Sequence, residues 1–321
     1  MGRIQVSNGK AFEYACLDSL YAVLSTMQEV LIDSTPQLDT AQQAFIDASS
    51  EMRERLVKAA NAATRVIARL EPQLEHPDNN IPLYLSIQAD AQGQIGDVRD
   101  VLCIRKQNDW EIGLSCKHNH RAVKHSRLSA TIDFGHEWFD IPCSQEYFNV
   151  VTPLFDELRD IRENSGNTAK WSDIENKHER FYVPVLRAFI EELLRLDLEN
   201  PLTIPERLIR YLVGRNDFYK IITNDSKKTT LVEAINIAGS LNRPSEGKRS
   251  IVNVARLKLP MRFYNVSFRT GSKTTIEVVC DEGWTVSMRI HSAKTLIEPS
   301  LKFDVNLISL PNTIHAQVEP W

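Results

Sequence analysis

The chain has 321 residues, of which 42% are hydrophobic and 25% are charged, the balance of a globular protein with one large domain or two of ordinary size. It has no run of about 18 apolar residues and no apolar leader, so we expect a cytoplasmic protein without a membrane span. Its five cysteines are scattered and form no CxxC pair, so we expect reduced thiols and neither a disulfide framework nor a structural zinc site. The formal charge of −4 does not by itself indicate nucleic-acid binding, although a local basic patch on an acidic chain can still bind DNA.

The N-terminal part of the chain predicts helices. Apolar residues recur at helical spacing over residues 9–28. Residues 34–36 then form a helix start, because proline is favoured at the first helical position. We expect one long helix from there to about Leu70.

Strand patterns replace the helical spacing in the next part of the chain. Residues 83–88 and 100–105 predict two strands, separated by a turn at residues 90–96. Residues 110–117 predict a third strand, which is antiparallel to the second because the connection between them is tight. Residues 121–130 look helical.

The second half of the chain predicts helices followed by strands. The predicted helices are residues 147–164, 171–198, 205–213 and 231–238. Residues 250–310 alternate in the manner of strands. Proline, serine and glycine make residues 241–248 the best candidate for a linker.

An aspartate begins one predicted strand and a lysine ends its hairpin partner. Asp100 opens the first, and Ser115 and Lys117 share one face of the second because residues two apart point the same way. Glu111 shares that face but lies about 20 Å from Lys117, too far to share a site with it. Carboxylates that hold Mg²⁺ beside a cation are what phosphodiester hydrolysis requires. Alternatively, these residues are turn carboxylates and a solvated strand end.

The segment that follows this lysine is strongly basic. Residues 117–127 contain four cations and three histidines and no acidic residue. We interpret the segment as a helix start that contacts phosphate through backbone N–H groups and basic side chains. A solvated basic face is the alternative, and zinc ligation by the histidines lacks a helical i, i+4 pair with a nearby carboxylate. The basic side chains in question are Arg121, Lys124 and Arg127, and the histidines are His118, His120 and His125.

These features together resemble a known nuclease family. Asp100, followed by a hairpin into a strand that ends Ser115-Cys-Lys117, resembles the PD-(D/E)XK nuclease core. The fuller string from Gly96 to Ser129 looks like the HaeIII family of type II restriction endonucleases. Residues 211–220 and 300–305 are similar to that family too, so the likeness spans most of the chain.

The resemblance implies a fold and a division of the chain. The fold class would be α/β (α+β), with a restriction-endonuclease-like PD-(D/E)XK core, a helical insertion and a β-rich C-terminal region. The three expected regions are a nuclease core with long N-terminal helices at residues 1–145, a mainly helical DNA-contacting region at 146–245, and a β-rich region that takes part in DNA recognition at 246–321.

The resemblance also implies an activity. The chain would be a Mg²⁺-dependent enzyme that cleaves double-stranded DNA at a short palindrome, which is GGCC in the family's namesake. A palindromic site favours a homodimer, because each subunit can then read one half of the site. The host would need a cognate DNA methyltransferase for protection. A repair or recombination nuclease with the same core, or a DNA-binding module with a decayed site, remains an alternative.

Five residues are implied as the catalytic set. Asp100 would bind Mg²⁺, and Lys117 would orient the attacking water and stabilise the phosphate. Glu13 lies where the first helix of such cores often supplies a further carboxylate. Ser115 stands where the family pattern has an acidic residue, so either Glu13 or Asp97 completes the metal site or the metal is bound weakly.

Recognition of GGCC requires donors for guanine and acceptors for cytosine N4. Residues 215–220 offer both types, and the C-terminal strands carry further basic residues, although any one of these can also be part of a solvated strand face. The predicted DNA contacts are His118, Asn119, His120, Arg121, Lys124, His125, Arg127, Arg215, Asp217, Lys220, Arg269, Lys273 and Arg289.

Overall fold

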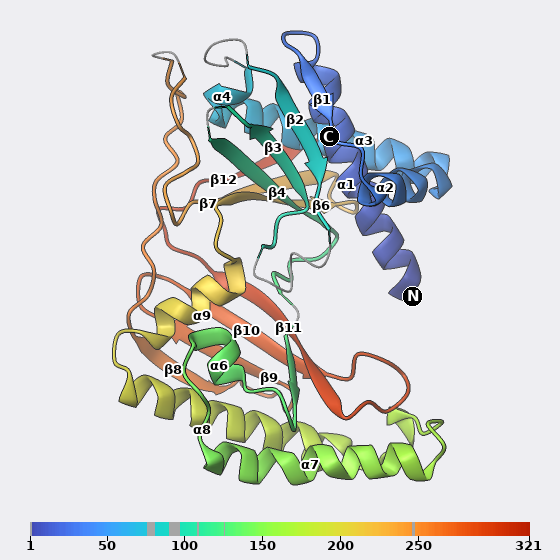
Figure 1. The fold of residues 1–321 in the computed structure, drawn as a ribbon, viewed down its shortest axis with the longest axis vertical. Helices are drawn as coiled ribbons and strands as arrows, with labels where there is room; N and C mark the ends of the chain where they lie inside the picture. The colour runs from blue at the N-terminus through green and yellow to red at the C-terminus, as the bar shows by residue number, and fades with distance from the viewer. Residues whose placement is uncertain (1, 76–80, 90–96, 108, 125, 246–247) are drawn as a thin grey trace. The chain divides into compact units, whose positions relative to one another are not determined.

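The computed structural model describes residues 2–75, 81–89, 97–107, 109–124, 126–245 and 248–321. These residues form a mixed α/β protein, which confirms the expected fold class. The chain divides into two compact units (Figure 1): unit 1 comprises residues 1–121, 214–257 and 313–321, and unit 2 comprises residues 122–213 and 258–312. Each unit joins segments that are distant in the sequence, so its limits differ from the three consecutive regions expected above. Among the described helices, none has the length and apolar character needed to cross a membrane.

Unit 1 is built on a seven-stranded sheet with helices beside it (Figure 1). Its helices are α1 (Gly2–Leu24), α2 (Pro36–Asp47), α3 (Ser50–Leu70) and α4 (Pro72–Glu75). Its strands, in their order across the sheet, are β1 (Val30–Ile32), β2 (Leu83–Ile87), β3 (Val101–Arg105), β4 (Trp110–His118), β6 (Phe218–Asn224), β7 (Thr229–Ile235) and β12 (Ala316–Pro320). The pairs β1–β2 and β4–β6 are parallel, and the other neighbouring strands are antiparallel.

The core of unit 1 lies between one face of this sheet and α1 and α3. Phe12 and Cys16 of α1 are buried in the same cluster as Leu114 and Cys116 of β4. Because side chains alternate along a strand, the odd-numbered residues of β4 point to the opposite face. This alternation places Ser115 and Lys117 away from the apolar core.

The single long helix expected from residue 36 to residue 70 was wrong. The backbone is extended at Ala48, with ψ of 148°, and α3 begins after Ser49. The Ser49 hydroxyl accepts a hydrogen bond from the Met52 amide at 3.2 Å. Since serine is a favoured N-cap, it begins a second helix where the sequence suggested continuation.

Two further helix predictions were wrong because the segments concerned form strands, which pair in part with strands far away in the sequence. Residues 231–238 were expected to be helical, but β7 instead pairs with β6 and β12. Residues 121–124 and 126–130 contain no helix and include β5 (Arg127–Ser129), which pairs with β11. The basic segment therefore does not form a helix start.

Unit 2 is a five-stranded antiparallel sheet with a layer of helices (Figure 1). Its strands, in order across the sheet, are β5, β11 (Ser300–Ser309), β10 (Thr285–His291), β9 (Thr275–Cys280) and β8 (Phe263–Phe268). Its helical elements are α6 (Phe134–Phe139), α7 (Gln145–Asn164), a 3₁₀ turn (Trp171–Asp173), a π-helical turn (His178–Tyr182), α8 (Val183–Glu199) and α9 (Ile204–Val213). The predicted helix over residues 171–198 is thus three separate elements.

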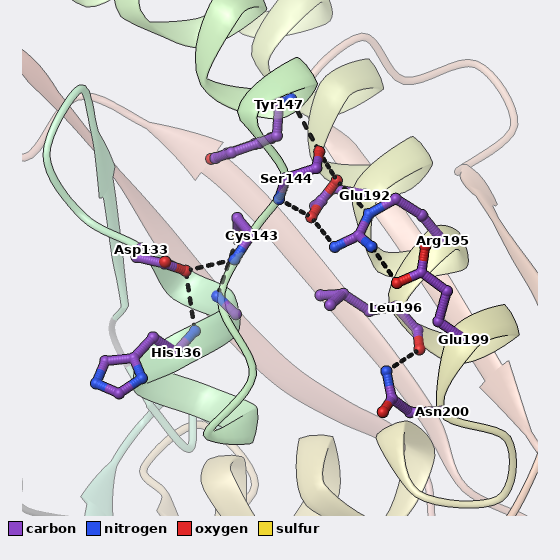
Figure 2. Close-up of polar contacts among 11 residues, drawn as sticks. Asp133, His136, Cys143, Ser144, Tyr147, Glu192, Arg195, Leu196, Glu199 and Asn200 are labelled. Carbon is purple, nitrogen blue, oxygen red and sulfur yellow. Dashed lines mark hydrogen bonds and ion pairs between the residues drawn. The ribbon is translucent and has the colours of Figure 1, made fainter.

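Aromatic packing and a buried glutamate hold the helical layer of unit 2. Phe303 of β11 packs against Phe189 of α8, with ring centroids 5.2 Å apart. Figure 2 shows Glu192 of α8 at the start of α7, where its carboxylate accepts hydrogen bonds from the amide and the hydroxyl of Ser144, both at 2.7 Å. Arg195 pairs with the same carboxylate. Because Phe303 faces the helices, its neighbours along β11 point to the other face of the sheet, which carries charged side chains.

Candidate active site

Asp100 and Lys117 lie together at one end of the β3–β4 hairpin. Val101 pairs with Leu114, and the Asp100 amide donates to the Leu114 carbonyl at 2.7 Å, so Asp100 lies beside Ser115. Lys117 Nζ is 3.3 Å from Asp100 Oδ2, and the Cys116 amide donates to the same oxygen at 2.6 Å. The antiparallel register thus brings the acid at the start of one strand to the amine near the end of its partner.

Glu13 of α1 belongs to the same cluster. Glu13 is only 7% exposed, and its Oε2 accepts a hydrogen bond from Lys10 Nζ at 3.0 Å. Burial, and after it the negative charge of Asp100, raise the pKa of Glu13 to about 7 against the opposing effect of Lys10 and Lys117. Three residues from separate elements therefore share one electrostatic environment.

The carboxylates of Glu13 and Asp100 are oxygen ligands of the kind that Mg²⁺ prefers. Among the residues that the structure describes, no group of three or more His, Cys, Asp or Glu side chains could hold a metal. Mg²⁺ usually keeps several of its waters and needs only one or two protein carboxylates. Burial is the main cause of the raised pKa of Glu13 and the negative charge of Asp100 is the next, and a divalent cation would offset both.

Asp97 lies in a separate ion-pair network. Its carboxylate accepts hydrogen bonds from Arg99 at 2.8 and 2.6 Å and from Asn216 at 3.1 Å. Burial opposes the ionisation of Asp97, but the hydrogen bonds from Arg99 lower its pKa overall. Arg99 also pairs with Glu111 and crosses Gly113, where a Cβ would be 2.0 Å from the arginine Cδ. The structure thus joins Asp97 to Arg99 rather than to Glu13 and Asp100.

Ser115 and Lys220 are buried neighbours on β4 and β6. Ser115 is 2% exposed and its Cα is paired in register with that of Lys220, which is 3% exposed. Lys220 Nζ donates to the Arg121 carbonyl at 2.7 Å. Lys220 therefore lies beneath the surface in this structure, next to the position where an acidic residue was expected.

Hydrogen bonds with Asp225 hold the segment that follows Lys117. His118 Nε2 and Asn119 Nδ2 lie 3.0 and 3.1 Å from Asp225 Oδ2, and the Asp225 amide donates to Asn119 Oδ1 at 3.0 Å. Asn119 has a φ of 59°, a left-handed conformation that asparagine tolerates. These contacts give His118 and Asn119 structural partners. His125 lies outside the described residues.

Two of the predicted phosphate contacts have partners within unit 2. Lys124 Nζ donates to the Tyr211 carbonyl at 3.0 Å and lies 3.5 Å from the centroid of its ring. Arg127 contacts Glu298 at 3.3 Å and the Ser300 hydroxyl at 2.8 Å. His120 is half-buried, and Arg121 is exposed.

The remaining predicted DNA contacts differ in exposure. Arg215 is exposed and lines a pocket of about 180 Å³ in unit 1. Asp217 is 4% exposed, and its carboxylate accepts hydrogen bonds from three amides of the turn at residues 237–240. Three exposed basic residues of unit 2, two in the β8–β9 connection and one in β10, pair with carboxylates, as Arg269–Glu277 at 3.4 Å, Lys273–Glu179 at 2.5 Å and Arg289–Asp304 at 2.7 Å.

Comparison with known proteins finds a family match over nearly the whole chain. The family model described as the HaeIII restriction endonuclease matches residues 9–311. The chain is similar to the type II restriction enzyme HaeIII of Haemophilus aegyptius, with 41% identity over 315 residues that cover 98% of this chain and 97% of that protein. No solved structure matches. The resemblance inferred from the sequence is therefore confirmed.

Proposed function

Because the chain belongs to the HaeIII restriction endonuclease family, we propose that it is a Mg²⁺-dependent type II restriction endonuclease that cleaves double-stranded DNA at a short palindrome, GGCC. The observation that carries the proposal is the meeting of Asp100, Lys117 and Glu13 in unit 1. The order α1, β2, β3, β4, with β6 parallel to β4, is compatible with a PD-(D/E)XK core.

Glu13 and Asp100 would hold the metal. A Mg²⁺ ion bound there would supply positive charge for the phosphate and make a bound water more acidic. Lys117 would orient the attacking water and stabilise the negative charge that develops on the phosphate. Burial opposes the charge on Lys117, but Asp100 raises its pKa overall, so the amine stays protonated. Cleavage would leave 5′-phosphate and 3′-hydroxyl ends.

Serine at position 115 does not prevent this arrangement. Glu13 occupies the cluster with Asp100, whereas Asp97 is paired with Arg99. We therefore assign the second carboxylate of the metal site to Glu13. Ser115, buried beside Lys117, would contribute to the shape of the site rather than bind the metal.

DNA contacts would come from both units. The exposed side chain of Arg121, four residues after Lys117, would contact phosphate. The basic residues on the sheet of unit 2, among them Arg269 and Arg289, would exchange their carboxylate partners for DNA. A homodimer would read the two halves of a palindrome, and a cognate methyltransferase would protect the host DNA.

A digest of defined plasmid DNA with Mg²⁺, followed by sequencing of the termini, tests the proposal. We expect discrete fragments whose ends map to one short palindrome. Cleavage that follows junctions or lesions would instead indicate a structure-specific nuclease. Retention of DNA without cutting would indicate a binding module, and either result would overturn the assignment.

A further inference from the structure

A row of polar residues crosses four neighbouring strands of unit 1. Asp100 lies beside Ser115, Ser115 pairs in register with Lys220, and Lys220 pairs with Glu233. Their sequence neighbours Val101, Leu114, Tyr219 and Val232 belong to the apolar core. By alternation, the row therefore points to the other face of the sheet.

Lys220 is the buried cation of this row. Lys220 is 3% exposed, and Glu233 is 9% exposed. Burial, with smaller contributions from Lys117 and Arg121, lowers the pKa of Lys220 to about 8 against the opposing effect of Glu233. A buried ammonium group is costly unless it is paired and hydrogen-bonded, so an apolar side chain here would be less costly for folding. The proposed phosphate chemistry at Lys117 does not use this group.

Lys220 donates a hydrogen bond to the segment that carries the exposed cation Arg121. Lys220 Nζ donates to the Arg121 carbonyl at 2.7 Å. Asn119, two residues earlier, is held by the Thr223 carbonyl at 3.0 Å and by Asp225. With Lys117 in β4, the short segment 117–121 is thus fixed at its start, its middle and its end.

We propose that Lys220 is a positioning residue that holds the Arg121 carbonyl, so that the Arg121 side chain is presented to a phosphate next to the one that Lys117 contacts. The inference rests on the proposed function and adds a role for Lys220 that differs from direct contact with DNA. It also accounts for serine at position 115, because a carboxylate there would lie beside Lys220 and would pair with it rather than bind metal.

A double-mutant cycle between Lys220 and Arg121 tests the role. Lys220→Met leaves an unbranched side chain one atom shorter and removes the charge and the hydrogen bond, while Arg121→Ala removes the phosphate contact. We expect each single change to weaken binding to duplex DNA in Ca²⁺ about fivefold and to reduce the slope of log affinity against log salt by about one phosphate contact. The double variant should bind like Arg121→Ala alone, because both changes remove one contact. Additive losses, or a slope unchanged in Lys220→Met, would overturn the proposal.

Controls separate positioning from a general loss of structure. Lys227 is an exposed lysine in the turn after β6, and Lys227→Met should bind and melt like the natural protein. Lys220→Met should still fold, and its Tm reports the balance between the removed buried cation and the loss of the positive charge beside Glu233. If it does not fold, Lys220→Gln gives the same cycle with a side chain that can still donate, and restored binding there supports the role. Because binding is measured in Ca²⁺, a protein that never cuts but shows the same cycle would refute only the nuclease assignment.

Discussion

The candidate site of unit 1 and the charged sheet face of unit 2 use the same residue types in opposite ways. In unit 1, Glu13 and Lys220 are buried, and burial shifts their pKa values to about 7 and about 8. In unit 2, Arg289 pairs with Asp304 across neighbouring strands, and the arginine side chain is 58% exposed. Buried charges interact strongly and keep one geometry, whereas exposed pairs contribute little and exchange partners readily. The difference suits chemistry in one unit and adaptable contacts in the other.

Removal of either member of the Asp100–Lys117 pair gives the largest expected effect. Asp100→Ala and Lys117→Ala should each reduce single-turnover cleavage by about 10³-fold or more, because each loses a charge aimed at the reacting phosphate. DNA binding in Ca²⁺ should stay largely intact. Glu54→Ala, at an exposed position of α3, is the matched acidic control and should cleave normally. Full activity in either site variant would show that unit 1 has been assigned the wrong residues.

Two buried glutamates extend the comparison to stability. Burial raises the pKa of Glu71 in unit 1 to about 7, so the folded state holds its proton more tightly and stability falls as pH rises from about 4.5 to about 7. Burial also opposes the ionisation of Glu192 in unit 2, but hydrogen bonds from Arg195 and Ser144 lower its pKa overall. The stability that Glu192 contributes is present above about pH 4.5 and is lost as pH falls through its folded pKa.

Replacement of each glutamate by glutamine is therefore expected to change the free energy of unfolding at pH 8 in opposite directions. Glu71→Gln should stabilise the protein at pH 8 by about 1–2 kcal/mol and have little effect at pH 5. Glu192→Gln should destabilise it at pH 8 by about the same amount, because Arg195 loses a charged partner. Urea unfolding at the two pH values measures both. Equal signs at pH 8 would mean that the two buried carboxylates do not differ as the structure indicates.

The Mg²⁺ requirement for cleavage distinguishes Glu13 from Asp97 as the second carboxylate of the metal site. Glu13→Gln should raise the Mg²⁺ concentration needed for half-maximal cleavage by about tenfold. Because the pKa of Glu13 is about 7 in the metal-free protein, Mg²⁺ competes with a proton, and its apparent affinity should rise from pH 6 to pH 8. This dependence should flatten in Glu13→Gln. Asp97→Asn is the matched control, and a larger Mg²⁺ requirement in that variant would reverse the assignment.

Local patterns predicted the hairpin that carries the site. The strands at residues 100–105 and 110–117 and the tight connection between them are short-range features, and they fixed the meeting of Asp100 with Lys117. The i, i+3 spacing of Lys10 and Glu13 would also have indicated their ion pair. Segments 121–130 and 231–238 were misjudged because their conformation depends on pairing with strands far away in the sequence.

Side-chain partners were harder to predict than elements. Asp97 was a candidate metal ligand, but the structure joins it to Arg99 and Asn216, and the second of these lies 119 positions away. Asp217 was a candidate base contact, but its oxygens hold a turn that the sequence did not reveal. For Asp217, and for the contact of Asp97 with Asn216, the tertiary fold supplied partners that residue type and spacing do not specify.

The smallest expected effect concerns the sheet of unit 2 and decides whether its charges serve DNA. Arg289→Ala and Asp304→Ala each break the exposed pair, and the free energy of unfolding should change by less than about 1 kcal/mol in either variant. If Arg289 contacts DNA, its loss should weaken binding severalfold and lower the salt slope by about one, whereas Asp304→Ala should not lower the slope. Equal effects on binding would mean that the pair serves the fold alone. Chemical denaturation and binding titrations at several salt concentrations distinguish these outcomes.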